Sequence, residues 1–266
     1  MAGEGGDTPV FQPGNLAVEL IQVNGEKAPK PPTPILIAAP TVAGTYPVAM
    51  CFHGLFIPSQ FYSEVLKHCA SFGFIMVAPQ LQVNIFAPTS GEEEIASASK
   101  VIDWLPEGLP SVLPKGVKPD VSKLALAGQS GGGHTAFALA LGYGKTSLRF
   151  SALIGLDPVA GLSKTSQVSP KILTYKPSSF NIDIYAGLGH HRHRAWRSEE
   201  MIPRHSSGVS ARRGAAASKD PMRRTVAGIT VAFLEATLSG QGDDLSAIMG
   251  NPGLAPTTLD PVELRY

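Results

Sequence analysis

A short glycine-rich turn centred on a serine constrains the fold of this chain more than any other feature. The segment Gly128-Gln129-Ser130-Gly131-Gly132 directly follows the apolar run 124–127 and precedes the apolar, alanine-rich stretch 136–141. A GxSxG sequence between a strand and a helix is typical of a nucleophile elbow, a turn so tight that it needs glycine two residues before and after the serine. The pattern predicts a strand–turn–helix unit presenting the Ser130 hydroxyl; the alternative is a glycine-rich loop that only begins a helix.

Apolar runs with two different periods alternate along the rest of the chain. Strand-like runs occupy 16–23, 35–39, 47–52, 74–78, 124–127 and 152–156, and stretches with helical spacing occupy 59–72, 91–105, 136–141 and 222–233. Ser59 and Ser90 are predicted to cap the first two helices, and 106–119 is predicted to be a loop. The alternation predicts one α/β domain over residues 1–266, with a mostly parallel central sheet and flanking helices.

Composition and charge exclude several classes of function. The chain has 266 residues and a formal net charge of +1, so no global field would recruit nucleic acid or an anionic surface. Its two cysteines, Cys51 and Cys69, do not make a disulfide framework and are predicted to be buried thiols. No apolar stretch is long enough to span a bilayer, and the first residues resemble no targeting segment. These features predict a soluble intracellular protein.

A serine nucleophile needs a base and a group that orients the base. In the strand–elbow–helix arrangement the partners follow the serine in the order acid, then histidine. Asp157 directly follows the strand 152–156, at the sheet edge where ligands bind, and is the candidate acid. The alternative is that Asp157-Pro158 only starts a turn.

The negative charge that develops on a carbonyl oxygen needs two backbone N–H donors. The candidates are the amides of Gly131, next to the nucleophile, and of Leu55, in the loop after the strand 47–52. Bulky Phe56, Ile57 and Phe61 follow in the same region and suit an apolar acyl or alcohol group. They are equally suited to the core.

Several longer stretches resemble the chlorophyllase family, and the resemblance spans most of the chain. They are residues 50–54, 72–80, 124–133, 150–159, 171–175 and 221–224. The resemblance implies an α/β-hydrolase fold and hydrolysis of the ester that joins chlorophyll to phytol, in a chloroplast. It also implies an elbow serine, an aspartate matching Asp157 and a later histidine. We therefore expect a small-molecule ester substrate, no cofactor, no metal and no nucleic-acid partner; peripheral membrane contact is left open.

The chain departs from the family pattern at the elbow and in the segment 185–220. Chlorophyllases usually carry histidine and arginine beside the serine, where this chain has Gln129 and Gly131. The later segment is rich in arginine, histidine and alanine, and contains no strand-like run. We therefore expect a sheet truncated at its C-terminal edge and an atypical, insert-like basic segment.

The catalytic histidine of the family has no recognisable match in this segment. His190 and His205 are substitutes only by elimination, and a metal site built from the histidines of 190–193 lacks a supporting carboxylate or cysteine. We hypothesise that residues 185–218 derive from a shifted reading frame or altered splicing. Reading the transcript in its other frames tests this, because one frame should then encode apolar strands and a glycine–histidine pair.

Four functions stay open at this point. The first is a chlorophyllase-like ester hydrolase acting through Ser130, impaired if no histidine acts as base. The second is a general carboxylesterase or lipase of the same architecture. The third is an inactive homologue that binds pigment or lipid in the apolar cleft. The fourth is an anion-binding role for the basic segment 190–213, which has no helical face or aromatic interleaving to support it.

Overall fold

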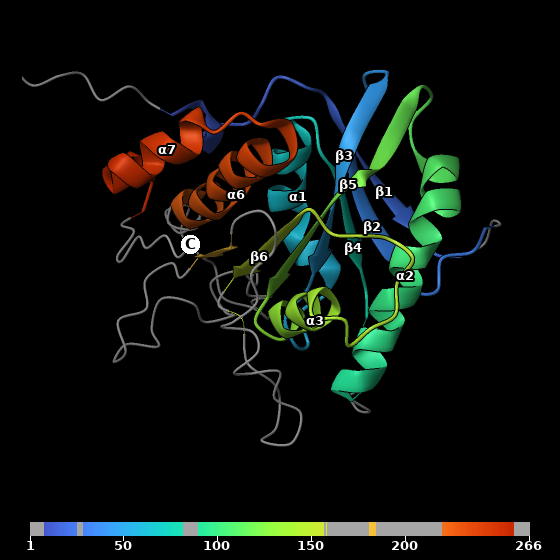
Figure 1. Ribbon diagram of the computed structural model, residues 1–266. Helices are drawn as coiled ribbons and strands as arrows, with labels where there is room; N and C mark the ends of the chain where they lie inside the picture. Colours follow the sequence, from blue (N-terminus) through green and yellow to red (C-terminus); the bar gives the residue numbers. More distant parts are fainter. Residues whose placement is uncertain are drawn as a thin grey trace, which may run out of the picture.

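A mixed sheet forms the centre of the protein (Figure 1). The computed structural model describes residues 8–25, 29–81, 90–156, 158, 181–184 and 220–257. The strands are β1 (Val18–Val23), β2 (Ile35–Pro40), β3 (Gly44–Phe52), β4 (Ile75–Pro79), β5 (Val117–Gln129), β6 (Ala152–Leu156) and β7 (Asn181–Ile184). Their spatial order is β1-β2-β4-β3-β5-β6-β7. β2 pairs antiparallel with β1 and β4, and the other neighbours pair in parallel.

Helices cover both faces of this sheet. The main ones are α1 (Ser63–Ala70), α2 (Gly91–Val112), α3 (Gly131–Ala140), α6 (Asp220–Leu234) and α7 (Asp243–Gly250). Shorter turns are η1 (Pro9–Phe11), η2 (Ser59–Tyr62), the π-helical turn η3 (Glu235–Ser239) and η4 (Pro252–Leu254). The mostly parallel sheet with flanking helices confirms the predicted fold class.

The sheet separates two hydrophobic layers. On β3, Ala49 and Cys51 pack in the layer that contains α1 and α6, whereas Val48, Met50 and Phe52 pack in the layer that contains α2 and α3. Successive side chains of a strand point to opposite faces, so a continuous apolar run fills both layers at once. Figure 1 shows α6 beside α1 and α3 on the side of α2. The parallel pairing of β3, β5 and β6 brings their carboxyl ends together at one edge of the sheet.

Helix α2 differs from its prediction, because it continues through Pro106 and Pro110 to Val112. Proline inside a helix removes a backbone hydrogen bond and costs about 3 kcal/mol. Leu105 and Leu109 on this helix are completely buried against the sheet. Burial of two leucine side chains, at about 1.5–3 kcal/mol each, offsets much of the local cost. The prediction of a loop here is therefore wrong.

The chain after β3 also differs from its prediction at Ser59. This residue begins the 3-10 turn η2, in which the Phe61 N–H donates to the Pro58 carbonyl, and α1 starts only at Ser63. The Ser59 hydroxyl makes no capping bond, while its N–H donates to Gln80 Oε1 at 2.8 Å. Because Pro58 precedes the 3-10 turn and Tyr62 precedes α1, the prediction that Ser59 caps the helix is wrong.

Other local predictions are confirmed. Ser90 and Glu93 form a reciprocal capping box at the start of α2, with bonds of 3.2 and 2.8 Å. Cys51 and Cys69 are buried free thiols.

The basic segment singled out above, 185–219, lies outside the described residues. The strand β7 ends immediately before it. The expected truncation of the sheet therefore stays a prediction. Among the helices of the described ranges, none has the length and apolar character that a bilayer crossing requires.

Candidate active site

Ser130 occupies a strained turn between β5 and α3. Its φ of 51° and ψ of −115° lie outside the regions that L-residues ordinarily adopt. The Ser130 N–H donates to the Leu156 carbonyl at the end of β6, at 3.0 Å, and the Ser130 carbonyl accepts from the His134 N–H at 3.2 Å. These bonds hold the serine, whose side chain is partly exposed, at the carboxyl edge of the sheet. Such strain at one residue is typical of a nucleophile elbow.

The backbone of the turn is too crowded for a side chain at Gly128 or Gly132. A Cβ on Gly128 would come within 2.1 Å of the Gly132 carbonyl oxygen. A Cβ on Gly132 would come within 2.2 Å of the Phe52 carbonyl oxygen at the end of β3. Both contacts are with main-chain atoms, which cannot rotate away. The steric argument made from the sequence therefore holds for both positions.

The loop after β3 reaches the elbow, because β3 and β5 are paired neighbours and Phe52 lies opposite Gly128. A Cβ built on Gly131 would lie 3.7 Å from the Leu55 backbone nitrogen. The amides of the two residues predicted as oxyanion donors therefore belong to adjoining segments. Two nearby amides are one requirement of an oxyanion hole, and the role of these two amides stays a prediction.

His53 stabilises this loop. Its Nε2 accepts the Leu81 N–H at 3.1 Å, so in the neutral ring Nδ1 carries the proton and donates to the Gly54 carbonyl at 2.9 Å. Burial lowers the pKa of His53 below its ordinary value, and the bond to Gly54 opposes that effect. These bonds give His53 a structural role within the loop.

The predicted substrate-lining residues lie in different environments. Phe56 is 49% exposed and has a positive φ of 61°, which turns the backbone next to Leu55. Ile57 is only 3% exposed and belongs to the core, and Phe61 is partly buried against the same core. Ile57 is therefore a core residue rather than a substrate contact, whereas Phe56 has the exposure that a substrate contact needs.

Three predicted site residues, Asp157, His190 and His205, lie outside the described residues. The two neighbours of Asp157 are described and both lie beside the elbow. Leu156 accepts the Ser130 N–H, and Pro158 packs on α3 so closely that a Cβ on Gly133 would come within 2.6 Å of its own. The role of Asp157 stays a prediction.

A buried carboxyl group on α2 was not identified from the sequence. Glu94 is 7% exposed, and its Oε1 accepts the Thr135 hydroxyl of α3 at 3.1 Å. The same hydroxyl lies 3.3 Å from the Gly131 carbonyl oxygen, so it links α2 to the first turn after the nucleophile. Burial raises the pKa of Glu94, and the bond to Thr135 opposes the rise. Nothing in the local sequence separates Glu94 from its exposed neighbours.

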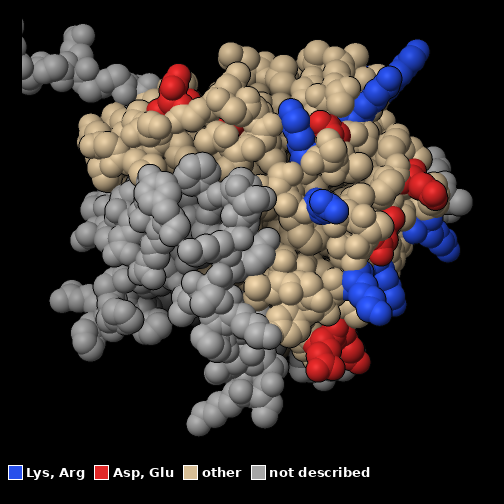
Figure 2. Space-filling view, viewed as in Figure 1, with Lys and Arg blue, Asp and Glu red and all other residues tan. Residues whose placement is uncertain are grey.

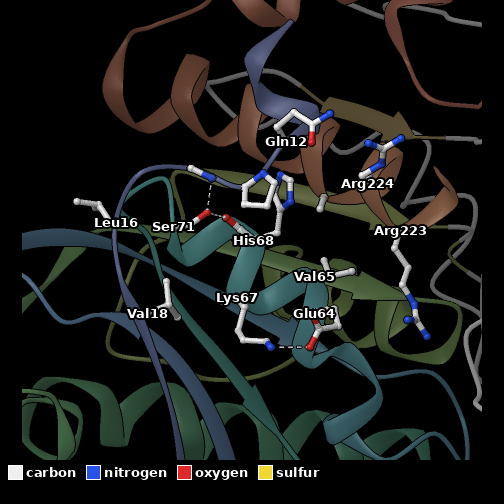
Figure 3. A pocket seen from close by; sticks show the side chains of 13 residues that line it. Gln12, Leu16, Val18, Glu64, Val65, Lys67, His68, Ser71, Arg223 and Arg224 are labelled. Carbon is white, nitrogen blue, oxygen red and sulfur yellow. Dashed lines mark hydrogen bonds and ion pairs between the residues drawn. The ribbon is translucent and has the colours of Figure 1, made fainter. Parts of the chain in front are cut away.

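A pocket of about 590 Å³ lies elsewhere, between the N-terminal segment, α1 and α6 (Figure 3). Its charged and titratable lining comprises Glu64, Lys67, His68, Arg223 and Arg224. Glu64 and Lys67 form an ion pair of 2.6 Å at its exposed rim. None of its lining residues belongs to the elbow or to the loop after β3. We therefore do not assign the ester site to this basic pocket.

His68, in this pocket, predicts a dependence of stability on pH. Its Nε2–H donates to the Val10 carbonyl at 2.7 Å. Burial lowers its pKa below 6.5, the nearby Arg224 cation adds to the effect, and the bond to Val10 opposes it. The unfolded chain therefore binds the proton more readily. The contribution of neutral His68 to stability is complete above about pH 6.5 and is lost as the pH falls through the folded-state pKa.

The matched variant for this prediction is His68→Gln, which keeps an N–H donor of similar reach and removes the titration. We expect urea unfolding to show wild type losing stability relative to His68→Gln as the pH is lowered from 7.5 to about 5.5. Contributions from buried carboxyls such as Glu94 cancel in this difference. A difference that stays constant or changes in the opposite direction contradicts the prediction.

Charges of both signs are mixed on the face of the protein that Figure 2 shows. On the face seen in Figure 2, basic and acidic side chains of the described residues are scattered among uncharged ones. This agrees with a net charge of +1. A neutral, apolar ester is the substrate class that such a surface neither attracts nor repels by charge.

Comparisons with known proteins point to one family. A family model described as Chlorophyllase matches residues 7–198 and 197–266. Chlorophyllase-1 of Arabidopsis thaliana is 37% identical over 296 residues, which cover 94% of this chain and 91% of that protein. "Chlorophyllase-1, chloroplastic" of Citrus unshiu is 36% identical, with coverages of 96% and 88%. Among solved structures, esterase B from Lactobacillus rhamnosis aligns with a TM-score of 0.46 at 16% identity, covering 95% of this chain and 64% of that one.

The alignments also show a difference in length between this chain and its relatives. They run over 296 residues, which exceeds the 266 residues of the chain, so the relatives carry residues that this chain lacks. The two parts of the family-model match meet at residues 197–198. That junction falls inside the segment 185–218, for which the sequence suggests a shifted frame or altered splicing.

Proposed function

Because the chain belongs to the chlorophyllase family, we propose that it hydrolyses the ester between chlorophyll and phytol through an acyl-enzyme on Ser130. The observation that carries this proposal is the strained backbone of Ser130, whose neighbour Gly131 lies beside the Leu55 amide. Names of two Citrus relatives include "chloroplastic", which supports action in the chloroplast.

In the proposed reaction the Ser130 Oγ attacks the ester carbonyl while a base removes its proton. The tetrahedral oxygen accepts hydrogen bonds from the amides of Gly131 and Leu55. The C–O bond to phytol then breaks, and the base returns the proton to the leaving alcohol. Water hydrolyses the acyl-enzyme by the same steps, which releases chlorophyllide and restores the serine. Asp157 orients the base in this scheme.

The identity of the base decides how fast this chain works. His53 and His68 are both engaged with backbone groups, and neither bonds to Ser130. His190 and His205 remain the proposed substitutes. Without a base, the elbow and oxyanion donors retain only the residual rate that such groups supply alone. This supports a second candidate function, an inactive homologue that binds pigment or lipid.

A serine-directed phosphonate probe separates the two candidates, because the reaction requires an activated hydroxyl. We expect wild type to be labelled, with the mass shift on the peptide that contains Ser130, and Ser130→Ala to be unlabelled with an unchanged melting temperature. Folded wild type that resists the probe, and binds chlorophyll equally well before and after Ser130→Ala, supports the inactive homologue instead.

The substrate class is tested with chlorophyll against a panel of short and long acyl esters. A chlorophyllase releases chlorophyllide with a kcat/KM well above that for simple esters, since the ratio of kcat/KM values measures specificity. A chain that prefers simple acyl esters is a general carboxylesterase.

A further inference from the structure

A buried hydrogen-bond relay connects the residue before the nucleophile to the residue before the second oxyanion donor. The Gly54 N–H donates to the Tyr62 hydroxyl oxygen at 3.0 Å, and the Tyr62 hydroxyl donates to Gln129 Oε1 at 2.5 Å. Tyr62 is 2% exposed and Gln129 is 5% exposed. An amide oxygen only accepts, so the phenol must donate to Gln129 and keeps a lone pair for Gly54.

The relay holds the Gly54 N–H, which belongs to the peptide unit directly before the one that carries the Leu55 N–H. The Gly54 carbonyl accepts the His53 Nδ1–H at 2.9 Å and the Ile57 N–H at 3.1 Å. In a trans peptide the N–H of one residue points away from the carbonyl of the residue before it. Holding both polar groups of Gly54 therefore sets the direction of the Leu55 N–H.

We propose that Tyr62 and Gln129 are positioning residues that aim the Leu55 amide at the developing oxyanion. The inference rests on the proposed function and extends it to two side chains with no direct contact to the ester. The proposal assigns a role to Gln129, which stands at a position where the family resemblance implies histidine. The approach is close, because a Cβ at position 54 would lie 3.0 Å from Gln129 Oε1 and would push the amide group aside.

The first test is Tyr62→Phe, which removes one oxygen from the relay. A misdirected oxyanion donor stabilises the transition state less and leaves the binding of the substrate in the ground state unchanged. Removing an oxyanion donor outright costs about 10²–10³ in kcat, so we expect a loss of about 10- to 100-fold in kcat with KM within about twofold. The matched control is Tyr46→Phe, because the Tyr46 hydroxyl donates to the carbonyl of exposed Val42 at 3.0 Å. Its kcat is expected to equal that of wild type.

The second test separates positioning from simple stabilisation. Tyr62→Phe leaves the buried Gln129 oxygen without its donor, which destabilises the fold. Adding Gln129→Met replaces that oxygen with an apolar group, so the double variant recovers part of the lost stability. The relay stays broken, so kcat is expected to stay low. Recovery of kcat together with stability contradicts the positioning role.

A third measurement does not depend on turnover. In ¹⁵N relaxation experiments the Leu55 amide of Tyr62→Phe is expected to be more mobile than that of wild type. If wild type hydrolyses esters but Tyr62→Phe matches it in kcat and Leu55 mobility, the positioning role is overturned and the proposed function stands. If wild type neither turns over nor reacts with phosphonate, the proposed function fails. A mobilised Leu55 amide then still supports the positioning role, and an unchanged one overturns it.

Discussion

Gly132→Ala is expected to prevent stable folding. The new Cβ would lie 2.2 Å from the Phe52 carbonyl oxygen and 2.6 Å from the His53 carbonyl oxygen. Relieving these contacts requires α3 to move away from the end of β3, which breaks the packing of both on the core. We expect a loss above about 4 kcal/mol in the free energy of unfolding, measured by urea denaturation, or insoluble protein.

Gly131→Ala is the matched control for this substitution. It adds the same methyl group one residue earlier, where the nearest atom is 3.7 Å away at ordinary contact distance. Gly131 begins α3, and alanine has a higher helix propensity than glycine. We therefore expect a change in stability below about 1 kcal/mol. Equal effects of the two substitutions contradict the steric account of the elbow.

Asp157→Asn is expected to lower kcat by about 10⁴-fold if this residue orients the catalytic base. Asparagine keeps the shape of the side chain and its capacity to begin a turn, but it loses the charge that stabilises a protonated histidine. The melting temperature should therefore change little. Ester turnover and the rate of phosphonate labelling provide two independent measurements.

The control for the aspartate is Asp120→Asn. Asp120 lies at the opposite half of β5 from the elbow, and its Oδ1 accepts the Ser122 N–H at 3.1 Å. Its replacement is expected to leave kcat within about twofold of wild type. If Asp157→Asn behaves in the same way, Asp157 only begins a turn, and the acid must be sought elsewhere.

Features that depend on near neighbours in the chain were predictable. The Ser90–Glu93 capping box uses groups three residues apart, so its pattern is visible in the sequence. The strand runs were also visible, because β-strands buried on both faces are continuously apolar. The elbow combined both signals, an apolar run and two glycines at fixed spacing.

Features that depend on burial were predicted less well. The prolines of α2 indicated a loop, yet the helix continues through them. Leu105 and Leu109, which directly precede the two prolines, are fully buried. A local pattern cannot weigh a helix-breaking residue against contacts made with a distant sheet. Ile57 illustrates the same limit, since an apolar residue beside a candidate site can line the site or fill the core.

The candidate site shows the same division. Ser130, Gly131 and Leu55 were predicted as site residues from motif and order alone, and the structure places Leu55 next to Gly131. The relay through Tyr62 was not identified, because Tyr62 and Gln129 are 67 residues apart. No spacing rule relates two such positions, and only the pairing of β3 with β5 brings their segments together.

The sequence by itself determined the strand–elbow–helix unit, because glycine spacing and apolar periodicity are local consequences of backbone sterics and burial. It also determined the family, because the matching stretches extend over nearly the whole chain. Only the tertiary structure decided which groups bond to Gly54, the residue before Leu55, and which helix continues through its prolines. These depend on contacts between segments far apart in the chain, whose energies outweigh local preferences once the sheet has formed.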